Sequence, residues 1–268
     1  MQFYLPEACM FVCSIISPNA QSKRYMKAVI PVAGAGTQLR PHTHTQPKPL
    51  IPVAGKPILG HIIDNLIQAG VKDHLFIVGY LKEKIQEYVE QNYAGKIEME
   101  FVVQEPRKGL GHALWMARNQ MARAEELLII LGDTIFDEDT QKILELPGNV
   151  LAVQEVDNPL KFGIAVVDED QSVVSLTEKP QIPISNLALV GMYKIEAVKA
   201  LIEELDQLVK RPLPASGEYA LTDALMQMLV KGHAFRAFRV ENWFDCGKKQ
   251  SLLHTNRILL ERSKGQTQ

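Results

Sequence analysis

The chain has 268 residues, of which 46% are hydrophobic and 22% charged, and its formal net charge is -2. These proportions are typical of a soluble globular protein, and the length suits one large α/β core, or one core with a small appendage. A net charge near zero argues against nucleic acid as the main partner. The three cysteines form neither a paired framework nor a metal-binding spacing, which favours a reducing cytoplasm.

Residues 1–25 do not share the pattern of the rest of the chain. Their apolar run, residues 8–16, is too short to span a bilayer. It follows Glu7 rather than a basic residue, which disfavours a secretory signal without excluding one. Met26 directly precedes the first predicted strand and would make a natural start. We expect residues 1–25 to be a loosely ordered extension and residues 26–262 to form one domain.

Residues 28–57 contain the most informative stretch of the chain. Residues 28–32 are an apolar run typical of a buried strand. Gly34 and Gly36 follow, and positive φ angles there would let the backbone approach a ligand and form an anion nest. The segment after them is basic and rich in prolines that prevent a regular helix: Arg40, Pro41, Pro47, Lys48, Pro49, Pro52, Lys56 and Pro57. Binding of several phosphates fits this pattern, and a glycine turn with a solvated basic loop is the alternative.

Two common phosphate-binding motifs do not fit this stretch. A dinucleotide-binding fingerprint has a third glycine and a helix directly after it, whereas Leu39 and prolines follow Gly36. A Walker A loop has Ser or Thr after Gly-Lys, whereas Pro57 follows Lys56. A dehydrogenase is therefore disfavoured.

Helices and strands alternate between residues 58 and 131. The pattern predicts strands at 75–78, 97–103 and 127–131, and helices at 58–68, 82–93 and 111–124. Such alternation indicates a parallel sheet with helices on both faces, which binds ligands at the carboxyl ends of its strands. Three segments each follow a strand: the glycine loop that begins at Gly34, residues 104–111, and Gly132-Asp133. We therefore expect these three segments to converge.

The pattern changes at about residue 148. Short strands are predicted at 150–155, 164–167, 173–176, 187–194 and 235–240, and they indicate an antiparallel or mixed extension over the sheet. Helices are predicted at 197–208, at 222–230 with Thr222 or Asp223 as cap, and at 249–262, where the last helix would close the domain.

The glycine loop resembles the signature loop of the sugar-1-phosphate nucleotidylyltransferases. That signature is roughly G-x-G-T-R-L-x-P followed by P-K-x-L-x-P, and this chain has GAGTQLRP at 34–41 and PKPLIP at 47–52. Gln38 stands where the family has an arginine that grips the triphosphate. Arg40 lies two residues further on and would project to the same side in an extended segment, so we hypothesise that it takes over this role.

Further motifs extend the resemblance over nearly all of residues 26–262. They are Q-x-x-x-x-G-L from Gln104, G-D at 132–133, E-K-P at 178–180, G-E-x-x-x-T-D at 217–223 and W-x-D-x-G at 243–247. The resemblance implies the Rossmann-like α/β fold of the nucleotide-diphospho-sugar transferases, a mixed, mainly parallel sheet with helices on both faces. Residues 26–147 would be its nucleotide-binding half and residues 148–262 its sugar-binding half.

The resemblance also implies roles for individual residues. The catalytic groups would be Lys48, Arg40, Asp133 and Asp245, with Mg²⁺ held by the two aspartates. The nucleotide would be bound by Ala33, Gly34, Gly36, Thr37, Gln104 and Gly109. The sugar phosphate would be bound by Gly163, Glu178, Lys179, Asn186, Leu189 and Glu218, although Glu218 could instead only support its loop.

Taken alone, these segments also have ordinary structural explanations. Residues 104–111 could be a simple strand–helix connection, Asp133 a turn or cap, and residues 178–180 a solvated turn. No spacing pairs Asp133 with Asp245, so only the resemblance connects them. Cys246 fits a buried thiol better than a nucleophile.

The implied reaction joins an NTP and a sugar 1-phosphate into an NDP-sugar and releases pyrophosphate. The segments at 109–112 and 245–247 favour UTP or dTTP with glucose 1-phosphate. A GTP-dependent mannose-1-phosphate guanylyltransferase stays open, as does a weakly active regulatory protein that binds nucleotide sugars, because of Gln38. We expect a cytoplasmic protein without nucleic-acid or membrane partners and without the second, acetyltransferase-like domain of some relatives. Homo-oligomer formation is left open.

Overall fold

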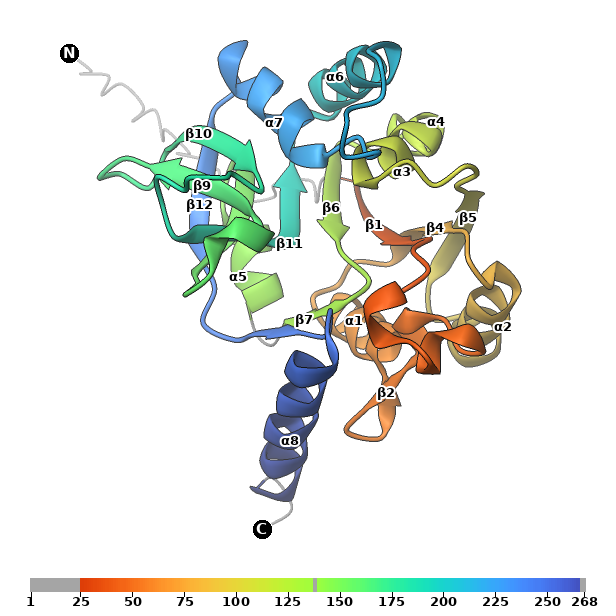
Figure 1. Ribbon diagram of the computed structural model, residues 1–268. Coiled ribbons are helices and arrows are strands. Elements are labelled where there is room, and N and C mark those ends of the chain that lie inside the picture. The colour runs from red at the N-terminus through yellow and green to blue at the C-terminus, as the bar shows by residue number, and fades with distance from the viewer. Residues whose placement is uncertain (1–24, 137–138, 266–268) are drawn as a thin grey trace, which may run out of the picture.

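The computed structural model describes residues 25–136 and 139–265, and a mixed sheet crosses the whole molecule (Figure 1). Within the described residues the sheet has nine strands, with the main order β10-β9-β11-β6-β1-β4-β5, while β8 pairs with β11 and β12. The predicted extension at residues 1–24 lies outside the described residues. Tyr25, which we placed in that extension, belongs to the domain instead, because its carbonyl accepts hydrogen bonds from the amides of Glu125 and Glu126.

The first half of the sheet is parallel, as predicted. Strand β1 (Met26–Val32) lies between β6 (Glu126–Ile130) and β4 (Asp73–Val78), and β4 pairs with β5 (Glu98–Val103). The connecting helices are α1 (Ile58–Gln68), α2 (Lys82–Tyr93), α3 (Leu110–Met116) and α4 (Arg118–Met121). The single helix predicted at 111–124 is thus wrong: it is divided at Ala117, whose φ of -93° and ψ of 5° interrupt the helix.

The second half extends the same sheet rather than covering it. Strand β11 (Leu187–Ile195) runs antiparallel to β6 and is followed outward by β9 (Gly163–Val167) and β10 (Val173–Glu178). Strand β8 (Asn149–Glu155) also pairs with β11 and runs parallel to β12 (Phe235–Arg239). The mixed character of this half is therefore as predicted, but its position over the sheet is not.

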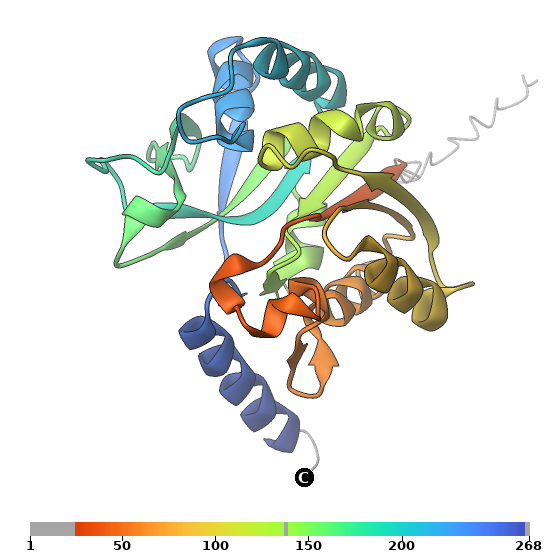
Figure 2. The same ribbon diagram turned by 45° about the vertical axis from the view of Figure 1, so that its right-hand side comes forward.

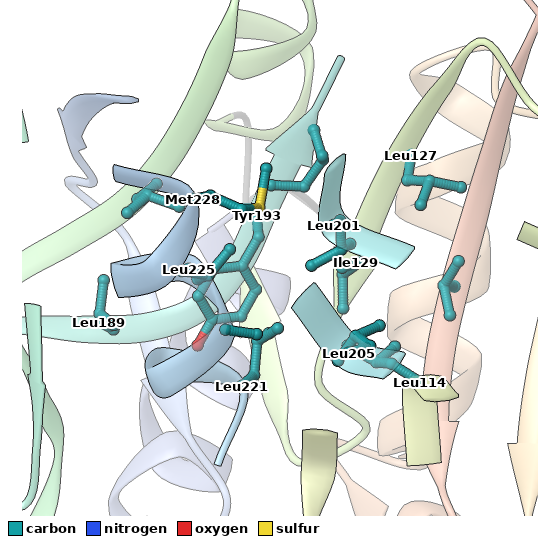
Figure 3. Close-up of a cluster of buried hydrophobic side chains, with 14 of the residues drawn as sticks. Leu114, Leu127, Ile129, Leu189, Tyr193, Leu201, Leu205, Leu221, Leu225 and Met228 are labelled. Atoms are coloured by element: carbon teal, nitrogen blue, oxygen red, sulfur yellow. The ribbon is translucent and has the colours of Figure 1, made fainter. Parts of the chain in front are cut away.

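Helices cover both faces of the sheet because neighbouring strand residues point to opposite sides. Val29 packs in the cluster beneath α3, α6 (Val198–Lys210) and α7 (Leu221–Val230), which Figure 3 shows in close-up. Its neighbours Ala28 and Ile30 pack in the opposite cluster, with α1, α2 and α5 (Asp139–Glu145). Two separate hydrophobic layers thus hold the strands, and hence their ends, in fixed positions.

The remaining elements are short, apart from the last helix. They are the 3-10 helices η1 (Thr37–Leu39), η2 (His42–His44), η3 (Lys48–Leu50) and η4 (Pro159–Lys161), and the strands β2 (Pro52–Val53), β3 (Lys56–Pro57), β7 (Thr134–Phe136) and β13 (Trp243–Asp245).

Helix α8 (Lys249–Gly265) extends away from the sheet in Figures 1 and 2, and its Leu252, Ile258 and Leu259 side chains pack against the cluster that contains Ala28 and Ile30. Thr255 Oγ1 donates to the Asp245 carbonyl at 3.1 Å, Asn256 Oδ1 accepts from the Ala54 amide at 2.8 Å, and Arg262, near the other end of the helix, donates to Asn242 Oδ1 at 2.8 Å. Across the part of the chain that the structure describes, no helix combines the length and apolar character needed to cross a bilayer.

Candidate active site

The segments that follow the parallel strands meet at one edge of the sheet, as predicted. The Ala33 carbonyl, just after β1, accepts from the Tyr80 amide at 3.1 Å, and the Gln104 amide, just after β5, donates to the Val78 carbonyl at 2.8 Å. Lys48 from the glycine loop reaches Asp133 beyond β6. Because β1, β4, β5 and β6 all run in one direction, their carboxyl ends form a single rim.

The glycine loop is built from three 3-10 turns. Gly36 has a φ of +60°, and a β-carbon there would lie 2.8 Å from Lys48 Cβ, so glycine is needed both for conformation and for space. Thr43 Oγ1 donates to the Gly36 carbonyl at 2.9 Å and closes the turn. Gly34, in contrast, is exposed and is not among the described glycines with positive φ, so the left-handed conformation predicted for it is wrong.

The extended segment expected around Gln38 and Arg40 is not present. Thr37–Leu39 forms a 3-10 helix, in which successive residues turn by roughly 120°, so side chains two apart do not share a side. Leu39 is buried while Gln38 and Arg40 are both exposed. Our geometric reason for letting Arg40 replace the missing arginine is therefore wrong. The Arg40 amide donates to the Thr37 carbonyl at 3.3 Å, but its side chain has no hydrogen-bond or ion-pair partner within residues 25–136 and 139–265.

Asp133 and Asp245 lie on adjacent backbone segments, although the sequence gives no spacing signal for this. Strands β7 and β13 form a two-stranded antiparallel ladder in which Thr134 is opposite Asp245. The amide of Cys246 donates to the Asp133 carbonyl at 2.9 Å. A side-chain hydrogen bond of 2.6 Å from Trp243 Nε1 to Thr134 Oγ1 strengthens the same ladder. This short ladder brings the ends of the two motifs together.

The two carboxylates have different partners. Lys48 Nζ lies 2.5 Å from Asp133 Oδ2, and the two side chains are 14% and 40% exposed. Asp245 Oδ1 accepts a 2.6 Å hydrogen bond from the Gly247 amide, which fixes its orientation. No group of three or more Asp, Glu, His or Cys side chains with metal-binding geometry occurs in the described part of the chain. Any ion here would draw its remaining ligands from water or substrate.

Two buried side chains lie beside these carboxylates. Burial, together with the charges of Asp245 and Asp133, raises the pKa of the Cys246 thiol to about 12, so this residue is a buried thiol as expected. Burial and the charges of Glu178 and Asp133 raise the pKa of Tyr193. Tyr193 lies in the buried strand β11, a position that gave no functional signal in the sequence.

The segment at 104–111 forms a compact loop between β5 and α3. Gln104 is 4% exposed, and its Nε2 donates to the Gly109 carbonyl at 2.9 Å. Gly109 has a φ of +91°, and a β-carbon there would lie 2.7 Å from the Tyr219 carbonyl oxygen. The amide of Tyr219 donates to the Lys108 carbonyl, and that of Gly111 to the Tyr219 carbonyl, both at 2.8 Å. The loop is therefore clamped against the segment that precedes α7.

The predicted sugar-side residues gather where β9 and β10 pair. Gly163 is opposite Glu178, and a β-carbon on Gly163 would lie 3.0 Å from Glu178 Oε2. Thr222 Oγ1 donates to Glu178 Oε2 at 2.6 Å. The predicted side-chain cap on α7 is therefore wrong, because Ala220 is the N-cap and no capping bond forms. Lys179 Nζ lies 3.5 Å from Glu178 Oε1, and burial and the charge of Glu178 raise the pKa of Asp223.

The other three predicted sugar-side residues are less closely grouped. Leu189 is buried in the hydrophobic cluster, with Cδ1 3.0 Å from the position of a β-carbon on Gly163. Asn186 is exposed, and its carbonyl accepts from the Val156 amide at 3.0 Å. Glu218 is exposed, and its Cβ lies 2.8 Å from the position of a β-carbon on Gly109, next to the other loop.

The comparisons with known proteins agree with this arrangement. Residues 27–262 match the family described as Nucleotidyl transferase. The chain is 37% identical over 244 residues to the low-salt glycan biosynthesis nucleotidyltransferase Agl11 of Haloferax volcanii, covering 88% of this chain and 66% of that protein. It is 37% identical over 238 residues to the bifunctional protein GlmU of Methanocaldococcus jannaschii, covering 88% and 55%. A Bacillus anthracis crystal structure described as a glucose-1-phosphate thymidylyltransferase in complex with sucrose superposes with a TM-score of 0.76 at 25% identity, covering 88% of this chain and 95% of that one.

The chain therefore belongs to the nucleotidyl transferase family, as the resemblance of its motifs implied. Its mixed sheet with helices on both faces is the fold of its structural neighbours, which confirms the predicted fold class. The chain spans between about half and two thirds of the length of these two curated relatives.

Proposed function

We propose that this protein transfers a nucleotidyl group from an NTP to a sugar 1-phosphate and releases pyrophosphate. The observation that carries this proposal is the contact of Lys48 with Asp133 beside the strand that ends at Asp245. It groups one cation and two hard oxygen ligands on the rim where a parallel sheet binds its ligands. Such a group suits a triphosphate accompanied by a divalent ion.

The reaction needs alignment and charge neutralisation more than acid–base catalysis. A phosphate oxygen of the sugar 1-phosphate attacks the α-phosphorus of the NTP, a new P–O bond forms, and the bond to the β-phosphate breaks. The attacking oxygen is already anionic, so no general base is required. Holding both substrates in line supplies much of the rate enhancement in such transfers.

The residues present fit Mg²⁺. Mg²⁺ is usually held by one or two carboxylates together with substrate phosphates and water, and Asp133 and Asp245 provide such a pair. When bound, Mg²⁺ would neutralise charge on the phosphate oxygens. Lys48 would exchange its contact with Asp133 for one with the pyrophosphate, and the unpaired Arg40 would assist it. Loss of one such charge contact typically costs about 3 kcal/mol.

The remaining residues divide between the two substrates. Ala33, Gly34, Gly36 and Thr37 would hold the phosphates of the nucleotide, with Gln104 and Gly109 at the base. On the other side Glu178 would accept from sugar hydroxyls and Lys179 would neutralise the sugar phosphate, in a pocket completed by Gly163, Asn186 and Leu189. Because Glu218 lies against Gly109, we assign it a supporting role for the base-binding loop rather than a sugar contact.

UTP or dTTP with glucose 1-phosphate is our favoured substrate pair. The test is an assay of pyrophosphate release with Mg²⁺, in which UTP, dTTP, GTP, CTP and ATP are each combined with glucose, N-acetylglucosamine and mannose 1-phosphates. We expect release with UTP or dTTP, and its loss in Asp133→Asn. Release only with GTP and mannose 1-phosphate would establish guanylyl transfer instead.

The uncharged Gln38 in the first 3-10 turn favours a second candidate, a nucleotide-sugar-binding regulatory protein with little turnover. Tight nucleotide binding without pyrophosphate release from any pair would support it. Gln38→Arg and Arg40→Ala separate the two candidates further. If Arg40 is catalytic, its removal lowers release by about a hundredfold, and the added arginine at 38 changes release little. If the protein is regulatory, Gln38→Arg alone should create or strongly increase release.

A further inference from the structure

The carboxamide of Gln104 is held in one orientation by two acceptors. Its Nε2 lies 2.9 Å from the Gly109 carbonyl oxygen and 3.3 Å from Nδ1 of His112. A carbonyl oxygen can only accept a hydrogen bond, so the amide nitrogen, and not the amide oxygen, must face Gly109. These two hydrogen bonds use both amide hydrogens of Gln104. Within the described residues, its side-chain oxygen Oε1 takes part in no hydrogen bond.

The same contact determines the protonation of His112. Because the amide nitrogen only donates, Nδ1 must accept, so the imidazole is neutral and carries its proton on Nε2. The ring is 5% exposed, and burial, together with the charge of Lys108, lowers its pKa. A neutral imidazole is therefore the form that the surroundings favour.

The surroundings of His112 hold its ring in place. The ring lies 5.7 Å from that of Trp115, centroid to centroid, on the next turn of α3. Trp115 is itself fixed by a 2.8 Å hydrogen bond from Nε1 to Asp206 on α6, and Arg118 covers its ring at 4.3 Å. His112 is thus a rigid acceptor supported from two helices, and it adds a second anchor for the Gln104 carboxamide to the one that the Gly109 carbonyl provides.

We infer that His112 is a positioning residue that selects the base of the nucleotide by holding the Gln104 carboxamide with Oε1 as the group presented to the ligand. The inference rests on the proposed function, in which Gln104 meets the base. A lone acceptor at this point pairs with a base that has a ring N–H on its Watson–Crick edge, such as uracil or thymine. Cytosine has an unprotonated ring nitrogen there and would be rejected, because two acceptors would face each other.

The test compares UTP with CTP, which differ at this edge, in wild type and in His112→Phe. The Phe variant keeps an aromatic ring beside Trp115 but removes the acceptor. We expect the ratio of kcat/KM for UTP over CTP to fall about fivefold, the size of one neutral hydrogen bond, through KM rather than kcat. His112→Asn, whose side-chain oxygen lies near the former position of Nδ1, should restore the ratio.

A matched control separates positioning from general support of the helix. Trp115→Phe, on the same helix as His112, keeps a ring beside His112 but removes the bond from Trp115 to Asp206 on α6. It should therefore lower the melting temperature and leave the UTP/CTP ratio unchanged. An unchanged ratio in His112→Phe, or an equal change in Trp115→Phe, would overturn the inference.

Two further measurements keep the inference testable if turnover or folding fails. If no substrate pair reacts, the proposed function fails, but the ratio of UTP and CTP dissociation constants still tests His112. If His112→Phe does not fold, ¹⁵N NMR of the wild-type imidazole tests the inference instead. The inference requires the Nε2–H tautomer at His112, and a proton on Nδ1 would refute it.

Discussion

Lys48 Nζ lies 2.5 Å from Asp133 Oδ2, so the cation of the glycine loop and the carboxylate after β6 neutralise each other in the absence of ligands. Both groups are charged contacts that a metal-bound triphosphate would use. In the proposed function, binding of substrate would therefore exchange this ion pair for two new contacts, one on each partner. The pair holds the loop in place before substrate arrives.

The exchange predicts opposite effects of Lys48→Met on metal binding and on turnover. Without the lysine, Asp133 is free for a cation, so Mn²⁺ should bind two- to fivefold more tightly in the absence of nucleotide, as expected for a partly exposed pair of about 1 kcal/mol or less. Turnover should fall about a hundredfold because the pyrophosphate loses its cation. Titration calorimetry with Mn²⁺ and a pyrophosphate assay measure the two effects. Lys48→Arg keeps the charge and is the control, and weaker Mn²⁺ binding in Lys48→Met would contradict the exchange.

Thr222 should affect the sugar substrate alone. Its hydroxyl donates to Glu178 Oε2 at 2.6 Å, and this bond orients the carboxylate. Replacing Thr222 by Val keeps the shape and removes the bond, so KM for the sugar 1-phosphate should rise about tenfold, or about 1.5 kcal/mol for a bond to a charged group. KM for the NTP should not change, and Thr222→Ser should behave like wild type. An equal rise in both KM values would show a general structural defect.

Gly109 should be essential for nucleotide use. Alanine there would require a φ of +91° and would bring its β-carbon within 2.7 Å of the Tyr219 carbonyl oxygen, so the loop at residues 104–111 must shift. A displacement of about 1 Å can cost about a hundredfold in rate, and we expect a loss of that size in kcat/KM for the NTP. Gly148→Ala is the matched control, because Gly148 has a φ of +79° but no neighbour within 4 Å of its β-carbon position. Similar losses of kcat/KM in the two variants would disprove the steric explanation.

His74 should make the stability of the protein depend on pH. It is fully buried, and burial lowers its pKa from 6.5 to about 4. Between pH 6.5 and 4 the unfolded chain therefore binds a proton that the folded protein does not, so stability falls as the pH falls through this window. Relative to His74→Leu, wild type should lose about 2 kcal/mol of unfolding free energy between pH 7 and pH 5.

Urea denaturation of both proteins at the two pH values measures this difference. The neighbouring Asp73 has a pKa raised to about 6 by burial and by Glu100 and Glu98, which acts in the opposite direction. Asp73 is present in both proteins, so its effect cancels in the comparison. A difference between the proteins that stays constant with pH would show that folding does not lower the pKa of His74.

Local patterns predicted the regular elements well. The helix expected at 58–68 is α1 and that at 82–93 is α2, with the same bounds, because an amphipathic period over eleven or twelve residues is a strong signal. The alternation of strands and helices also placed the three candidate ligand-binding segments on one rim. These features depend on sequence neighbours, which a single sequence contains.

Features that depend on distant contacts were not predictable in this way. Strands β7 and β13 have three residues each, too few to show a period, yet they bring Asp133 beside Asp245. Thr222 has the chemistry of a helix cap but bonds to Glu178 across the fold. The prolines after Gly36 indicated that no regular α-helix forms there, but a 3-10 turn needs only three residues and forms at Thr37–Leu39. The argument that Arg40 replaces the arginine missing at Gln38 assumed an extended segment, so this turn removed it.

The central claim is that Asp133 and Asp245 hold one divalent ion together. Crystals grown with Mn²⁺ and a non-hydrolysable UTP analogue test it directly, because anomalous scattering locates the ion. We predict one manganese peak whose ligands include a carboxylate oxygen from each aspartate and oxygens of the nucleotide. A nucleotide-bound structure in which the ion contacts only one of them, or neither, would contradict the account.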